Sequence, residues 1–252
     1  MSLFNNASNL FINGNSVSLA YLNGNQLFSQ TFMNPSLTIG SDVSVVAQSP
    51  FVGGGNSYSF ISSVDSYITT PGSNDWAVGT GDYTVEWFHY QTTQADFQRV
   101  FTVDDYPSID IGVSIEGASP TFYYWSDNDS TFVRSIFPAG NANTWYHWAI
   151  SRQSGVTKIF RDGVQIGTDV SDNNNISNNS TPLVVGNTNT FATNAAFIGY
   201  ITNFRFVKGL AVYTGAFTVP TSDLTATAVA NPYGGSNTQA IGSGFTKLLL
   251  VP

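Results

Sequence analysis

The chain of 252 residues is long enough for one sizeable core and too short for several large domains. Apolar residues make up 42% and charged residues only 10%, which excludes a disordered chain, a coiled coil and long amphipathic helices. The net charge of −8 excludes a nucleic-acid binder, because such a protein needs a basic surface. No cysteine is present, so disulfides, cysteine-based zinc sites and cysteine chemistry are excluded.

The first thirty residues contain a short internal repeat. Residues 11–15 (Phe-Ile-Asn-Gly-Asn) recur ten positions later as residues 21–25 (Tyr-Leu-Asn-Gly-Asn). Asn-Gly favours the tight hairpin turn, so residues 1–34 are predicted to form a three-strand β-meander. A short meander is marginal alone. We expect it to serve as an attachment arm or as an extra sheet on the main domain, with a partly disordered tail as the third alternative. The main domain spans residues 35–252 after the break at Asn34-Pro35.

The rest of the chain reads as short strands separated by turns. Residues 83–90 and 145–152 are aromatic and β-branched, the composition of strands buried on at least one face. Ser154-Gly155 and Asp162-Gly163 predict two successive hairpins. No long stretch combines helical periodicity with helix caps. The pattern predicts an all-β protein, an antiparallel β-sandwich.

Several bulky side chains in these strands are explained by the fold itself. Arg205 lies within an apolar strand and is expected to meet a carboxylate or carbonyls at a sheet edge, with ligand contact as the alternative. His89 and His147 are expected to be packed or hydrogen-bonded rather than catalytic. Four aromatic residues are predicted to lie in the core: Trp87, Trp145, Trp148 and Phe204.

A series of short segments follows in a fixed order between residues 49 and 250, and residues 197–209 form the strongest block. The others include residues 49–60, 65–68, 79–87, 143–147, 160–163, 182–186, 211–221 and 246–249. This order resembles the laminin-G-like jelly roll of the concanavalin A-like lectin/glucanase superfamily, which implies an antiparallel jelly-roll β-sandwich. Lys-Gly before Tyr213, followed by Phe-Thr-Val-Pro, looks like the versions found in phage virion proteins. The chain has Phe60-Ile61-Ser62 where the family often has Phe-Asp-Gly, so no role of that Asp is carried over.

The carboxylates do not suit glycoside hydrolysis. Retaining glycosidases hold two carboxyl groups about 5 Å apart, which alternate positions on one strand can supply. Glu86 and Glu116 are the only glutamates, and they are thirty residues apart. The sequence contains no nucleophile elbow, phosphate-binding loop or zinc-protease motif. We therefore predict that the protein is not an enzyme.

Candidate ligand-binding residues lie in two acidic clusters with neighbouring aromatic rings. Tyr106, Trp125, Asp127, Asn128 and Asp129 combine an aromatic face with the oxygen acceptors that bind sugar hydroxyls. For Trp125, core or rim packing is the alternative. The same clusters, which also include Asp104, Asp105 and Asp110, contain the oxygen ligands that calcium prefers, so a bound calcium ion stays an open alternative. No other cofactor is expected. The Asn-rich segment 172–180 is predicted to be a long exposed loop.

Two functions fit these features. The first is a virion structural protein, a phage head decoration, fibre or tail-associated protein that carries a lectin-like jelly roll for glycan or host-surface adhesion. Its partners would be other capsid or tail proteins, copies of itself in a homo-oligomer, and cell-surface glycan, with no nucleic acid and no membrane; it would lie on the virion surface. The second is a carbohydrate-binding module of an extracellular protein.

Overall fold

The computed structural model describes residues 8–12, 15–22, 25–27, 34–94, 97–103, 111–116, 121–126, 133–177 and 181–252. These residues form β-strands and one short 3₁₀ helix, η1 (Thr193–Ala195). The strands are Ser8–Ile12 (β1), Asn15–Leu22 (β2), Asn25–Leu27 (β3), Thr38–Ile39 (β4), Ser44–Val46 (β5), Ser57–Phe60 (β6), Ile68–Thr69 (β7), Tyr83–Gln91 (β8), Gln98–Val103 (β9), Ile111–Glu116 (β10), Thr121–Ser126 (β11), Val133–Pro138 (β12), Trp145–Gln153 (β13), Val156–Arg161 (β14), Val164–Gln165 (β15), Val170–Ser171 (β16), Leu183–Val185 (β17), Gly199–Lys208 (β18) and Thr246–Leu250 (β19).

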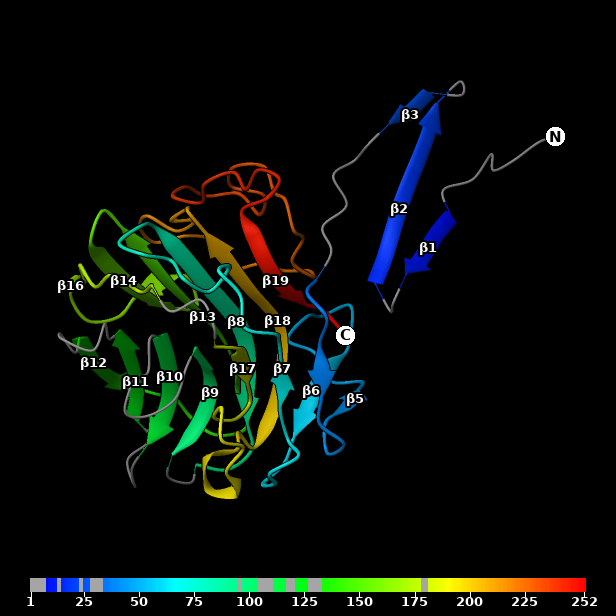
Figure 1. The fold of residues 1–252 in the computed structure, drawn as a ribbon. Helices are drawn as coiled ribbons and strands as arrows, with labels where there is room; N and C mark the ends of the chain where they lie inside the picture. The colour runs from blue at the N-terminus through cyan, green and yellow to red at the C-terminus, as the bar shows by residue number, and fades with distance from the viewer. Residues whose placement is uncertain are drawn as a thin grey trace.

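Two antiparallel sheets lie face to face and form a sandwich (Figure 1). One sheet has seven strands in the order β12-β11-β10-β9-β17-β7-β4. The other has nine strands; its main path is β15-β14-β13-β8-β18-β6-β5, with β16 paired to β14 and β19 paired to β18. Consecutive strands pair in β9–β12 and in β13–β15, whereas β17 pairs with β9 and β18 with β8 and β6 across long stretches of sequence, as in a jelly roll. The predicted all-β sandwich is confirmed.

The predicted N-terminal meander is confirmed as a three-stranded sheet. Strand β2 pairs with β1 on one side and with β3 on the other, both antiparallel. The two Asn-Gly turns and the expected end of the third strand lie outside the described residues. The division of the chain into residues 1–34 and 35–252 stays a prediction.

The predicted hairpins of the main domain are also present. Ser154 and Gly155 connect β13 to β14, and Asp162 and Gly163 connect β14 to β15. All four residues have positive φ, as the tight turn requires at both central positions. Gly163 is needed for a second reason: a Cβ there would lie 2.2 Å from the carbonyl oxygen of Phe217.

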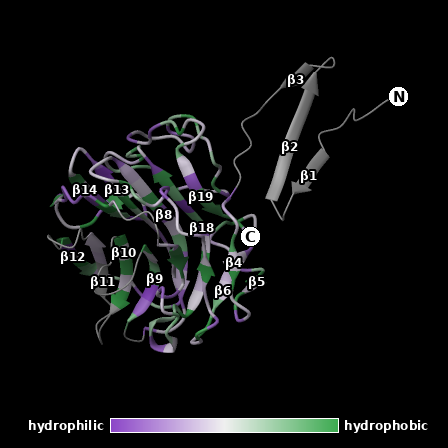
Figure 2. Cartoon of the chain, viewed as in Figure 1, coloured by the Kyte–Doolittle hydropathy of each residue, from purple (hydrophilic) through white to green (hydrophobic). Residues whose placement is uncertain are grey.

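The main core lies between the two sheets, and hydrophobic residues, green in Figure 2, run along the strands of both. Trp87, Trp148 and Phe204 are fully buried in it, as predicted. The prediction for Trp145 is wrong, because its side chain is partly exposed. Trp145 and Trp148 are three residues apart on β13, and side chains alternate along a strand, so the two rings lie on opposite faces of the sheet.

His89 also belongs to this core. Its ring contacts Trp148 and Phe197, and its Nδ1 accepts a hydrogen bond from the Trp87 indole N–H at 3.0 Å. Burial lowers the pKa of His89 to about 3, so the ring is neutral near pH 7. The expectation that this histidine is packed and hydrogen-bonded is confirmed.

A second, smaller core covers part of the outer face of the nine-stranded sheet. Residues 209–245, named here the covering segment, connect β18 to β19 across that face. Val212, Tyr213, Phe217 and Ile241 of this segment pack on outer-face residues that include Phe160. A hydrogen bond of 2.9 Å from the Phe217 N–H to the Gly163 carbonyl fixes the segment to the β14–β15 hairpin.

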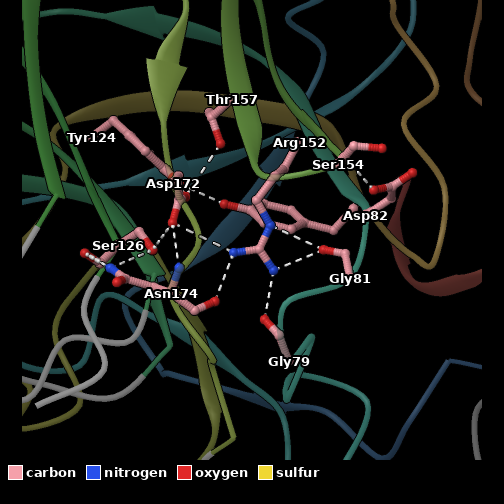
Figure 3. A network of polar contacts seen from close by, with 11 residues as sticks. Gly79, Gly81, Asp82, Tyr124, Ser126, Arg152, Ser154, Thr157, Asp172 and Asn174 are labelled. Atoms are coloured by element: carbon pink, nitrogen blue, oxygen red, sulfur yellow. Dashed lines mark hydrogen bonds and ion pairs between the residues drawn. The ribbon is translucent and has the colours of Figure 1, made fainter. Parts of the chain in front are cut away.

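A buried polar network connects the loop after β16 to the sandwich (Figure 3). The Asp172 carboxylate accepts hydrogen bonds from the Tyr124 hydroxyl at 2.6 Å and the Ser126 hydroxyl at 2.9 Å, and it lies 3.5 Å from the Arg152 guanidinium. Arg152 also donates to the carbonyls of Gly79, Gly81 and Asn174. The prediction that segment 172–180 is an exposed loop is wrong for Asp172, Asn174 and Ile176, which are buried.

Candidate functional site

Glu86 of β8 is fully buried between the nine-stranded sheet and the covering segment. Its Oε1 accepts from Arg205 Nε at 2.9 Å and from Arg205 Nη2, and its Oε2 accepts from the Tyr213 hydroxyl at 2.6 Å. Burial alone would raise the pKa of Glu86, but the Arg205 charge and the hydrogen bonds from His147 and Tyr213 lower it to about 2. Glu86 is therefore ionised near pH 7.

Arg205 connects this carboxylate to the covering segment. Besides Glu86 it binds the Thr225 carbonyl oxygen through Nη1 at 2.6 Å. The expectation that Arg205 meets a carboxylate is confirmed, whereas the carbonyl that it binds belongs to the covering segment and not to a sheet edge. A pocket of about 270 Å³ lies beside it, lined almost wholly by the covering segment. Because Glu86 neutralises Arg205, the described residues of this pocket offer no unpaired cation to a ligand. It is a weaker candidate for a binding site than the pocket lined by His147, described below.

His147 of β13 is the third partner of Glu86. Its Nε2 lies 3.2 Å from Glu86 Oε2, and its ring packs against Phe88 with centroids 4.7 Å apart. An ionised carboxylate only accepts hydrogen bonds, so Nε2 carries the proton of this contact. Nδ1 is buried and has no hydrogen-bond partner within the described part of the chain.

His147 lines an open pocket of about 330 Å³ on the outer face of the nine-stranded sheet. We name this the outer-face pocket. Three aromatic side chains, Phe51, Phe88 and Trp145, form part of its wall, and Phe51 meets Phe88 edge to face at 5.3 Å. Residues 50–53 and 219–221 complete the lining together with His147 and Asp162.

Trp145 also belongs to an aromatic patch beside the pocket. Trp145, Tyr90 and Tyr200 lie directly opposite one another on the adjacent strands β13, β8 and β18. Tyr90 lies 5.6 Å from each of the other two rings, centroid to centroid, and Trp145 lies 6.4 Å from Tyr200. All three side chains are partly exposed, so the covering segment leaves this end of the sheet face open. We name the pocket and this aromatic patch together the outer-face site.

The polar groups of the outer-face pocket are mainly hydrogen-bond acceptors. Asp162 Oδ1 accepts the backbone N–H of His147 at 2.9 Å, which fixes the carboxylate beside the aromatic wall. Rings with a few convergent acceptors suit a ligand that has apolar faces and hydroxyl groups.

Of the residues proposed as ligands from the sequence, only Trp125 lies in the described part of the chain. Tyr106, Asp127, Asn128 and Asp129 lie outside the described residues, as do Asp104, Asp105 and Asp110. Trp125 of β11 belongs to the seven-stranded sheet; its side chain is 7% exposed, and the Arg99 guanidinium lies over its ring at 4.7 Å from the centroid. Within the part of the chain that the structure describes, no group of three or more His, Asp or Glu side chains could hold a metal ion.

Sequence reasoning missed most of the outer-face site. Tyr90, Tyr200 and Phe51 lie in predicted strands or family segments that carry no predicted binding role, and Trp145 is predicted to lie in the core. The alternation of side chains along β13 and β8 is the signal that indicates these rings. It places Trp145 and Tyr90 on the opposite face of the sheet from the core residues Trp148 and Trp87.

The topology and the ring-lined outer face define a jelly-roll sandwich of the lectin type. The chain belongs to the concanavalin A-like lectin/glucanase superfamily, whose family model matches residues 62–212. No curated protein sequence matches the chain. In the part that the structure describes, no helix is long and apolar enough to span a membrane.

Solved structures of other proteins share the fold at low identity. Domain 4 of an extracellular arabinanase from Geobacillus stearothermophilus, solved with arabinotriose, is 16% identical with a TM-score of 0.54, over 72% of this chain and 85% of that domain. The enzymatically active domain of tailspike protein 2 from bacteriophage CBA120 is 14% identical with a TM-score of 0.59, over 86% of this chain and 33% of that one. The binding domain of botulinum neurotoxin serotype G is 16% identical with a TM-score of 0.51, over 76% of this chain and 47% of that one.

Proposed function

We propose that this protein is a non-catalytic, lectin-like domain that binds glycan through the outer-face site. The observation that carries the proposal is the combination of the partly exposed Trp145–Tyr90–Tyr200 patch with a pocket that offers His147 and Asp162 as acceptors. A pyranose ring presents C–H groups on its faces and hydroxyls around its edge. The aromatic rings would contact the C–H faces, and the acceptors would bind the hydroxyls.

The surroundings of the carboxylates support binding without catalysis. A glycosidase acid needs a raised pKa and access to the glycosidic oxygen. Glu86 has a lowered pKa, is fully buried and is bound to three other side chains. Glu116 belongs to β10 of the opposite sheet, so the two glutamates do not share a strand.

Replacing Trp145 with alanine tests the binding proposal. We expect W145A to weaken binding to the glycan that the wild type prefers by at least tenfold on a glycan array followed by titration calorimetry, because the ring contributes to both the patch and the pocket. Tyr67, a partly exposed ring stacked on Phe191 at 4.0 Å outside this site, provides the matched control Y67A. Equal binding by the wild type and W145A would refute the assignment of the site.

The residues Tyr106, Trp125, Asp127, Asn128 and Asp129 remain a second proposed binding region. The same array would distinguish the two regions, since a Tyr106→Ala variant removes a ring of the second region and changes none of the described residues that line the outer-face pocket. Calcium dependence of glycan binding, measured by adding a chelator, would indicate that the acidic residues of this second region hold the ion.

We further propose that the domain is displayed on a virion, where it adheres to host-surface glycan. The fold shared with a phage tailspike domain supports this role, and so does the separate β1–β3 sheet, which we infer to be an attachment arm contacting capsid or tail proteins or other copies of the chain. The fold shared with an arabinanase domain favours the alternative, a carbohydrate-binding module of an extracellular protein.

The location of the protein decides between these two settings. We expect mass spectrometry of density-purified particles to find the chain at a fixed copy number per particle, and deletion of residues 1–33 to abolish this incorporation while the remaining domain stays folded. Recovery of the full-length chain only as free protein in the culture medium would contradict the virion role and favour the module.

A further inference from the structure

The outer-face pocket has an acceptor that nothing else in the described chain uses. Nε2 of the His147 ring donates to Glu86, and in the tautomer with its proton on Nε2 the other nitrogen, Nδ1, is an acceptor. The His147 side chain is fully buried, and buried acceptors without a donor are rare in folded proteins. A ligand hydroxyl entering the pocket would provide that donor.

A second acceptor is fixed beside it by the backbone. Asp162 lies in the tight turn after β14 with a φ of 50°. Its own N–H donates to the His147 carbonyl at 2.8 Å, and its Oδ1 accepts the His147 N–H at 2.9 Å. These two bonds place an exposed, negatively charged group at the pocket rim.

No lysine or arginine balances this charge among the described residues that line the pocket. The nearby cations have other contacts. Arg161 donates to the Pro138 carbonyl and lies over the Tyr146 ring, and Lys158 donates to the Thr214 carbonyl. Arg205 is paired with Glu86. The chain as a whole carries a charge of −8, which adds repulsion toward any anion at longer range.

We propose that the outer-face pocket selects uncharged sugars and rejects acidic ones: His147 Nδ1 accepts a ligand hydroxyl, and the Asp162 carboxylate repels uronic, sialic and sulfated groups. This inference rests on the proposed glycan binding and adds the ligand class. The aromatic wall of Phe51, Phe88 and Trp145 contacts sugar rings of either kind, so discrimination comes from the two acceptors.

The test uses an array that presents neutral oligosaccharides beside their sulfated, sialylated and uronic-acid counterparts. We expect the full-length wild type to bind its preferred neutral glycan at least tenfold more tightly than the acidic counterpart. D162N keeps an oxygen for the His147 N–H and removes the charge, so we expect this ratio to fall at least threefold. Intact mass would verify that the new amide has not hydrolysed.

Two further variants separate the contributions. D65N makes the same change in net charge at an exposed carboxylate outside the pocket, so the ratio should stay unchanged. H147Q retains an N–H for Glu86 and removes the Nδ1 acceptor; we expect at least fivefold weaker binding of the neutral glycan. If H147Q does not fold, the comparison of D162N with D65N decides the question.

The outcomes distinguish this inference from the proposed function. Tight binding of acidic glycans by the wild type, or equal effects of D162N and D65N, would overturn the selectivity while glycan binding stands. Absence of binding to every glycan on the array would overturn the proposed function, and this inference with it.

Discussion

Replacing Arg205 with methionine should lower the free energy of unfolding by about 3–5 kcal/mol, because it leaves the Glu86 carboxylate buried without its cation. Methionine retains an apolar chain of similar length, so little of the loss comes from a cavity. The variant also removes the hydrogen bond from Arg205 to the Thr225 carbonyl, which ties the covering segment to β18. Urea denaturation monitored by tryptophan fluorescence provides the measurement.

An exposed ion pair offers the matched control. Lys247 Nζ lies 3.5 Å from Asp75 Oδ1, with side chains 27% and 45% exposed. K247M should therefore change the free energy of unfolding by less than about 1 kcal/mol. The double variant E86Q/R205M should recover part of the R205M loss, since glutamine can accept from Tyr213 without a charge.

The pH dependence of the same variants checks the cause. The pKa of Glu86 is lowered from 4.5 to about 2 in the folded protein, so its contribution to stability is fully present above pH 4.5 and is lost as the pH falls toward 2. The difference between the wild type and R205M should accordingly shrink over that interval. A difference that stays constant down to pH 2 would show that the ion pair is not its source.

Replacing Asp172 with alanine should have a similarly large effect, a loss of about 3–5 kcal/mol. The substitution leaves the fully buried Arg152 without its carboxylate, and it removes the acceptor shared by Tyr124, Ser126 and Thr157. Because these partners belong to β13, β11 and β14, the change loosens both sheets at one end of the sandwich. Thermal and urea denaturation would measure it.

Asp169 provides the comparison for Asp172, since it lies three residues earlier and is exposed, with its Oδ1 accepting from Gln165 at 2.8 Å. D169A should change stability by no more than about 0.5 kcal/mol. If D172A and D169A proved equally mild, the network of Figure 3 would contribute little to folding.

The fold could be predicted because its signals are local. Asn-Gly, Ser-Gly and Asp-Gly pairs mark turns by backbone conformation alone, and the positive φ values at Ser154 and Asp162 agree. The aromatic composition of β8 and β13 marks buried strands. The order of segments between residues 49 and 250 indicated the superfamily before any contact was known.

The candidate site was less predictable because it depends on distant parts of the chain. Glu86 and Arg205 are 119 residues apart, and nothing local in the sequence pairs them. The pocket joins residues 50–53, β8, β13 and residues 219–221. The composition around Asp172 and Asn174 is typical of a loop, yet both residues are buried, because both contact the Arg152 guanidinium in the interior.

Asn34, at the start of the sandwich, has a consequence for self-association. Its side-chain amide donates to the Leu249 carbonyl at 2.7 Å and accepts the Leu249 N–H at 2.9 Å. It thus occupies the N–H and C=O groups of Leu249 in β19, as a neighbouring strand would. A single amide thereby blocks strand addition by another molecule at this point, the step through which open sheets grow into fibrils.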